Sequence, residues 1–123
     1  YKNKKIILDG SHNIDGAEKL NEFLKTKRIK PVVLFGMLNN KKASLFLNKI
    51  KKRISKVLAI KIPDEKNSFK TKQINEICYS YSIKCKEVNN INDALKYFRS
   101  NQEKIYLITG SLYLIGKIRR RLF

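Results

Sequence analysis

The chain has 123 residues, with 28 Lys plus Arg against 10 Asp plus Glu, so its formal net charge is +18. Hydrophobic residues make up 42% of it and gather in short runs, which excludes a disordered basic tail and indicates one folded domain over residues 1–123. No run reaches the roughly 18 apolar residues of a membrane span, and no signal-type region follows the N-terminal lysines, so we expect a cytoplasmic protein without a membrane partner.

Apolar runs typical of buried strands alternate with segments of helical period. The runs lie at 6–8, 32–35, 57–62, 84–88 and 105–108, and the helical segments at 17–24, 43–54, 74–81, 94–98 and 112–122. Strand followed by helix at about 25-residue spacing is the pattern of repeated βαβ units. It predicts an α/β fold: a three-layer, Rossmann-like α/β/α domain with a mostly parallel sheet of five to six strands. Ligands gather at the carboxyl ends of such strands, so the turns that follow them are the candidate sites.

The turn after the first run reads DGSHNIDGA, residues 9–17. Asp9 closes the strand, where its carboxylate is suited to ribose hydroxyls or an ammonium group. Ser11 or Asn13 is expected to cap the next helix, and His12, the only histidine, lies between them. Each of these residues also has an ordinary structural role in a loop. The chain contains neither GxGxxG nor GxxxxGK[ST], so it lacks a P-loop of its own.

The turns after the second and last runs place glycine directly behind a buried strand. They read FGMLNNKK, residues 35–42, and ITGSLYLIG, residues 108–116. Gly36 and Gly110 allow a ligand to approach the backbone, and Lys41 is placed to reach an anionic oxygen. Ser111 falls at a helix N-terminus, where a hydroxyl and free amides suit a carboxylate or phosphate. An ordinary N-cap explains Ser111 equally well.

Three stretches in this order and spacing resemble the C-terminal domain of folylpolyglutamate synthase and dihydrofolate synthase, in the Mur ligase superfamily. They are ILDGSHNIDGAEKLNEFL, VVLFGMLNNKKAS and ITGSLYLIGKIRRRL. The resemblance spans residues 5–122, although 63–104 agree only in the rhythm of strands and helices. Two departures stand out: Ile14 replaces a usual proline, and Asn40-Lys41-Lys42 replaces a more usual Asp-Lys-Asp, which removes two carboxylates.

The resemblance implies an ATP-dependent ligase of folate biosynthesis and one-carbon metabolism. In such enzymes ATP phosphorylates a carboxylate, the amine of glutamate attacks the acyl phosphate, and phosphate leaves as the amide forms. An N-terminal domain outside this chain would supply the P-loop, the Mg²⁺ ligands and most of the dihydropteroate or folate site, and this domain would close over it as a lid. We expect the isolated chain to fold without turning over ATP.

The resemblance also implies roles for individual residues, because their positions match the family's motifs. The implied nucleotide-binding residues are Asp9, His12 and Asn13, of which His12 is also catalytic. The implied glutamate- or phosphate-binding residues are Lys41, Ser111 and Tyr113. No metal ligand is assigned within the chain, and Cys78 and Cys85 can form at most one disulfide.

The basic charge supports a second interpretation, a stand-alone α/β domain that binds nucleic acid. A third is a stand-alone nucleotide-binding or regulatory domain. The lysines are scattered along the sequence, and Lys, Ile, Asn and Tyr, which share AT-rich codons, supply 56 of the 123 residues. We therefore favour a compositional origin for the charge and treat nucleic acid as the less favoured partner. The one local cluster, Arg119–Arg121, ends a helical segment, where cations complement the helix dipole.

Overall fold

The computed structural model describes all 123 residues. Five strands form one sheet in the order β1-β5-β2-β3-β4, and every pairing is parallel. The strands are β1 (Lys5–Asp9), β2 (Val32–Phe35), β3 (Lys56–Ala59), β4 (Cys85–Glu87) and β5 (Ile105–Thr109). The helices are α1 (Ile14–Lys27), α2 (Ala43–Ile50), α3 (Thr71–Ser80), α4 (Ile91–Ser100) and α5 (Leu112–Leu122), and a 3₁₀ turn, η1 (Lys51–Arg53), follows α2. The predicted α/β fold is confirmed.

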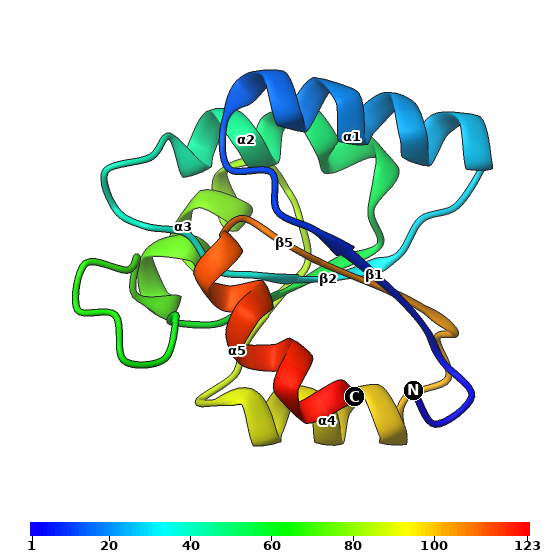
Figure 1. Ribbon diagram of the computed structural model, residues 1–123. Helices are drawn as coiled ribbons and strands as arrows, with labels where there is room; N and C mark the ends of the chain where they lie inside the picture. The colour runs from blue at the N-terminus through cyan, green and yellow to red at the C-terminus, as the bar shows by residue number, and fades with distance from the viewer.

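Helices α1, α2 and α3 cover one face of the sheet, and α4 and α5 cover the other (Figure 1). Right-handed crossovers explain this division. The chain moves in one direction from β1 through β2 and β3 to β4, so the three connecting helices share a face. It then returns to insert β5 between β1 and β2, and reversal of direction puts α4 on the opposite face.

Each face has its own apolar core. Phe35 and Phe46 meet under α1–α3 with ring centroids 5.7 Å apart, and Phe98 stacks on Tyr106 under α4 at 4.3 Å. All four residues of β2 are buried because this strand lies in the middle of the sheet. No helix combines the length and the apolar character needed to span a bilayer.

Most elements differ from their predicted ranges by one to three residues at an end, and two differences, at the ends of β3 and α2, have a clear cause. Strand β3 ends at Ala59, although the apolar run continues to Ile62. Ile60 and Ile62 remain buried beyond the ladder, so the run reports burial rather than strand pairing. Helix α2 ends at Ile50, η1 continues to Arg53, and Ile54, the predicted end of the helix, is extended.

Three side chains, two buried and one partly buried, have shifted pKa values. Burial, aided by nearby Glu103 and Tyr97, raises the pKa of Tyr106 to about 12. A hydrogen bond with Cys85, together with burial, raises the pKa of Cys78, and the same bond lowers the pKa of Cys85. Both cysteines are free thiols.

Candidate functional site

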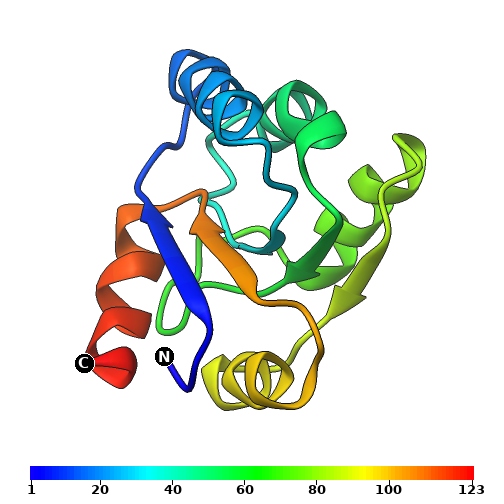
Figure 2. The same ribbon diagram turned by 90° about the vertical axis from the view of Figure 1, so that its right-hand side faces the viewer.

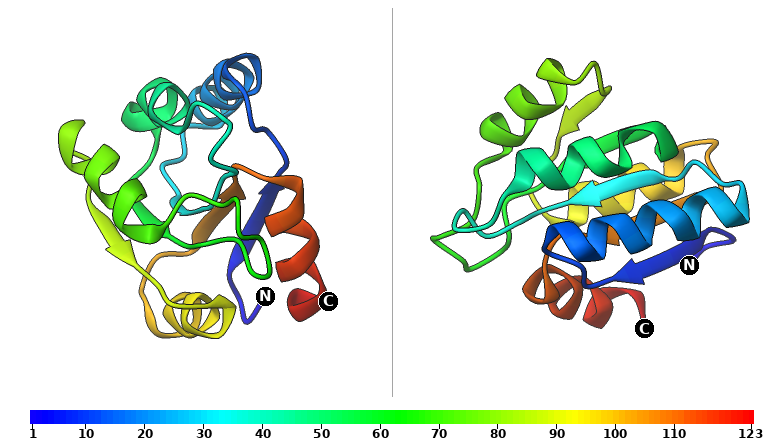
Figure 3. Two further views of the ribbon diagram at one scale, coloured as in Figure 1. Left: turned by 90° about the vertical axis from the view of Figure 1, so that its left-hand side faces the viewer. Right: turned by 90° about the horizontal axis from the view of Figure 1, so that it is seen from above.

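The candidate site lies at the carboxyl ends of β1, β5 and β2. The chain leaves β1 and β2 toward helices α1 and α2 on one face, whereas from β5, between them, it leaves toward α5 on the other. The connections therefore diverge and leave a crevice, which is where open α/β sheets bind ligands. Figure 3 (left) looks onto this end of the sheet.

Glycine at position 110 allows the loops to meet tightly. Gly110 has φ +108°, and a Cβ added there would overlap the carbonyl oxygen of Gly36. Its N–H donates to the carbonyl oxygen of Ser11 at 3.1 Å. This one residue thus joins the turns after β1, β2 and β5 and determines the shape of the crevice.

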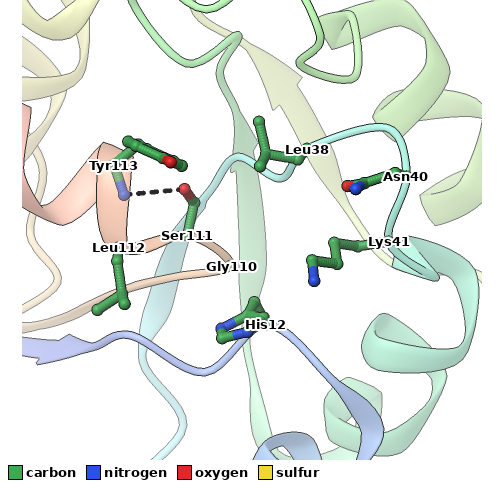
Figure 4. Close-up of a pocket in the computed structure, with 8 residues that line it drawn as sticks. All are labelled: His12, Leu38, Asn40, Lys41, Gly110, Ser111, Leu112 and Tyr113. Atoms are coloured by element: carbon green, nitrogen blue, oxygen red, sulfur yellow. Dashed lines mark hydrogen bonds between the residues drawn. The ribbon is translucent and has the colours of Figure 1, made fainter.

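A pocket of about 420 Å³ opens at this junction (Figure 4). We call it the site pocket. Its walls come from all three turns, and its lining residues are His12, Leu38, Asn40, Lys41, Gly110, Ser111, Leu112 and Tyr113. Four of the six residues singled out in the sequence, His12, Lys41, Ser111 and Tyr113, therefore share one pocket.

Ser111 begins α5 and is only 3% exposed. Its Oγ accepts the N–H of Tyr113 at 3.0 Å and that of Leu114 at 3.4 Å. Both bonds use lone pairs, so the hydroxyl proton is left to donate to a ligand. Leu112 and Tyr113 are mostly exposed at the mouth of the pocket.

His12 approaches from the opposite wall. Its Nδ1 lies 3.1 Å from the carbonyl oxygen of Gly10, so Nδ1 carries the hydrogen of that bond and Nε2 is left for other partners. Lys41 and Asn40 continue this wall (Figure 4). The three residues also line a second hollow of about 400 Å³, which adds Asn13.

The other two predicted residues serve the turn itself. Asn13 caps α1, and its Oδ1 accepts the N–H of Gly16 at 2.8 Å. Asp9 Oδ1 accepts the N–H of Ser11 at 2.7 Å, and Asp9 lines neither hollow. Its contact with a nucleotide ribose remains a prediction.

Three wall residues and one buried hydroxyl were not predicted from the sequence. Leu38, Asn40 and Leu112 line the site pocket, and Asn40 lies in the motif that departs from Asp-Lys-Asp. Thr109 is fully buried, its Oγ1 has no hydrogen-bond partner, and it pairs in register with Asp9. Nothing in the sequence pattern indicates that the Thr109 hydroxyl lacks a hydrogen-bond partner.

The donors of the site pocket suit an anion. Lys41 brings a positive charge, Ser111 a hydroxyl proton, and the N-terminus of α5 a favourable dipole. No group of three His, Cys, Asp or Glu side chains converges anywhere in the chain. The donors of the site pocket therefore fit a phosphate or a carboxylate.

Fold and pocket together define a doubly wound α/β domain with an anion-receptive site at its topological switch point. Residues 1–121 match the family model described as "Dihydrofolate synthetase, C-terminal domain". The chain is 32% identical over 127 residues to the dihydrofolate synthase/folylpolyglutamate synthase of Bacillus subtilis (strain 168), covering 95% of this chain and 27% of that protein. The chain belongs to the family of dihydrofolate synthetase C-terminal domains.

Solved structures show the same fold. Folylpolyglutamate synthase from Thermotoga maritima is 26% identical, with a TM-score of 0.82, over 97% of this chain and 28% of that one. The E. coli FolC complex with DHPP and ADP is 18% identical, also with a TM-score of 0.82, over 95% of this chain and 28% of that one. The chain thus spans little more than a quarter of the length of these relatives.

Proposed function

We propose that this chain is the lid domain of an ATP-dependent folylpolyglutamate or dihydrofolate synthase. In this proposal it helps to bind ATP and glutamate, while an N-terminal P-loop domain holds Mg²⁺ and most of the dihydropteroate or folate. Family membership supports the assignment, as do the related structures solved in complex with ADP, or with AMPPNP and Mn. In this scheme the Mg²⁺ ligands come from the partner domain.

The observation that carries the proposal is the convergence of His12, Lys41 and Ser111 in one pocket. They lie on three turns spread over nearly a hundred residues of sequence. Lys41 and Ser111 can donate to an anionic ligand, and His12 Nε2 can accept from an ammonium group. Parallel topology brings the three turns to one edge of the sheet, and the three side chains line the same space there.

The proposed reaction forms an amide from a carboxylate and the amine of glutamate. ATP transfers its terminal phosphoryl group to the carboxylate, the amine nitrogen attacks the resulting acyl carbon, and phosphate leaves with the bonding electrons. Lys41 and Ser111 would hold the carboxylates of glutamate or a phosphate, and His12 Nε2 would orient or deprotonate the incoming ammonium group. Tyr113 would join Lys41 and Ser111 in binding the glutamate carboxylates or a phosphate. Closure of this domain over the partner domain would exclude water, which otherwise hydrolyses the acyl phosphate.

The binding role of the site pocket can be tested by replacing Lys41 in the complete enzyme, in which this domain follows the P-loop domain. Lys41→Gln removes the charge from the pocket and is expected to lower kcat/KM for glutamate or ATP by at least tenfold. Lys66→Gln removes the same charge from an exposed loop that lines neither hollow and serves as the control. Wild-type kinetics for Lys41→Gln would overturn the binding role.

The isolated chain supplies a second test. It has a complete sheet and two cores but no P-loop, so it is expected to unfold cooperatively and to show no folate-dependent ATP hydrolysis. Measurable turnover by the 123-residue chain alone would contradict the division of labour between the domains.

A further inference from the structure

The positive charge is scattered along the sequence but gathered in space. In an all-parallel α/β sheet, helices end where strands begin, at the edge opposite the site pocket. We call this edge the amino edge. It consists of the chain segments that run from the last four residues of each helix to the first residue of the next strand, together with both chain ends. These segments are residues 1–5, 24–32, 47–56, 77–85, 97–105 and 119–123. Figure 2 looks onto it, and both chain ends lie there.

The amino edge holds almost the whole net charge of the molecule. It contains 18 of the 28 basic residues and one acidic residue, Glu103, for a net +17 of the formal +18. The rest of the chain is close to neutral. Only one of these cations is paired with a carboxylate, Lys49 with Glu18 at 3.2 Å. The edge therefore carries a dense and largely unneutralised charge.

A row of lysines runs along the beginning of the sheet. Every strand has one at its first residue or within two residues before it: in spatial order Lys5, Lys104, Lys30, Lys56 and Lys84. Four of the five are exposed. Because neighbouring strands lie about 4.8 Å apart, the row extends over roughly 19 Å.

Two ordinary explanations account for only part of this pattern. The helix dipole favours cations in the last turn of a helix, which applies to Arg119–Arg121 and Lys27. It does not reach the five lysines at the strand starts, because they lie in loops and strands. AT-rich codons raise lysine content at both ends of the sheet alike and therefore do not explain the segregation.

We propose that the amino edge binds single-stranded nucleic acid, in addition to the ligase role and independently of the site pocket. The row of lysines supplies phosphate contacts, and the same edge offers aromatic rings among its cations. A hollow of about 330 Å³ lies between η1 and the turn after α3, lined by Lys51, Lys52, Tyr81 and Lys84 among others. Tyr79 at the end of α3 is 87% exposed and free to stack on a base.

The positions of the exposed aromatic residues favour nucleic acid over an anionic membrane as the partner of the amino edge. Tyr79 lies on α3, which packs on β3 and β4, whereas the other exposed aromatic residue of the edge, Phe123, ends α5, which packs on β1 and β5. The two rings are separated by the width of the sheet. Membrane anchors gather in one insertion plane, whereas bases along a strand meet rings at intervals.

The test measures binding of a fluorescein-labelled oligothymidylate of about 20 nucleotides to the 123-residue chain as salt is varied. The edge variant is Lys30→Gln, Lys84→Gln, Lys104→Gln, and the control variant of equal net charge is Lys19→Gln, Lys66→Gln, Lys72→Gln; all six lysines are exposed. The slope of log K against log salt is expected to fall by about 2 in the edge variant, at about 0.7 per lost contact, and to stay unchanged in the control. Circular dichroism checks that both variants fold.

A stacking variant and two competing ligands complete the experiment. Tyr79→Ala is expected to weaken oligothymidylate binding by at least fivefold, because a base–ring contact is lost. Equal loss in edge and control variants overturns the proposal in favour of diffuse charge, and so does binding that vanishes for the wild-type chain by about 0.15 M salt. Tighter binding to duplex DNA of the same length, or to phosphatidylserine vesicles, overturns it in favour of those partners. Kinetics of the Lys41→Gln enzyme are independent of all these outcomes.

Discussion

The two ends of the sheet differ in almost every physical respect. The carboxyl edge has tightly packed turns built on glycine, a pocket of about 420 Å³ and one basic side chain directed to it, Lys41. The amino edge has a net charge of +17 spread over loops and helix ends. The site thus depends on backbone geometry and a few placed groups, whereas the charge lies away from it. The total charge of this chain says little about its site pocket.

The largest expected effect comes from Gly110, where the shape of the site depends on one backbone position. Gly110→Ala must adopt φ +108° and overlap the carbonyl oxygen of Gly36, so we expect it to lose about 3 kcal/mol or more of unfolding free energy. The control is Gly116→Ala, since a Cβ there meets nothing within 4 Å. That change is expected to stabilise α5 by up to about 1 kcal/mol. Urea denaturation measures both, and equal stability of the two variants would remove Gly110 from the account.

Thr109 sharpens the comparison because it is a buried group at the carboxyl edge without a partner. Thr109→Val removes the unpartnered hydroxyl at nearly constant volume and is expected to raise stability by about 1 kcal/mol, with an upper bound of roughly 3 kcal/mol. A fall in kcat/KM of the complete enzyme, together with higher stability, would indicate that the hydroxyl is held for a ligand. A loss of stability would show that Thr109 is satisfied in the folded chain.

Ser111 separates capping from binding. Ser111→Ala removes the N-cap of α5 and is expected to cost about 1 kcal/mol of stability. Asn90→Ala serves as the control, because it removes the N-cap of α4 and Asn90 does not line the site pocket. In the wild-type chain Asn90 Oδ1 accepts the N–H of Asp93 at 2.9 Å. Both variants should lose similar stability, but only Ser111→Ala should lower kcat/KM for glutamate. Equal kinetics would reduce Ser111 to a cap.

The smallest expected effect comes from the amino edge. The edge variant described above removes three exposed like charges, so its thermal midpoint should rise slightly at low salt and match the wild type in about 1 M salt. The control variant carries the same net charge but lies outside the crowded edge and should change less. A larger rise in the control would mean that the amino edge is not the main source of repulsion.

Hydrophobic periodicity predicted the fold closely because the residues that become buried are apolar and recur at strand or helix spacing. The run at 32–35 coincides with β2, since a central strand is apolar on both faces. The run at 57–62 overshot β3, because Ile60 and Ile62 are buried without belonging to the ladder. Local apolar patterns indicate which residues are buried. The ends of a strand depend instead on its hydrogen bonds to a neighbouring strand, which lies elsewhere in the sequence.

The site was predictable only where residues lie directly behind a strand. His12, Lys41 and Ser111 follow three strands, and parallel topology brings those turns together. Leu38 and Thr109 depend on how one loop packs on the next, and the +17 edge depends on which helix ends meet which strand starts. Such long-range features follow from the strand order, which periodicity does not supply.

The proposed contribution of the site pocket to catalysis depends above all on His12. His12→Ala removes no core volume, since the side chain is half-exposed in a loop, so the thermal midpoint of the complete enzyme should stay nearly unchanged. We predict that kcat/KM for glutamate falls by roughly a hundredfold, as expected when a reacting group is misplaced by about 1 Å. Wild-type kcat/KM at an unchanged midpoint would contradict the account.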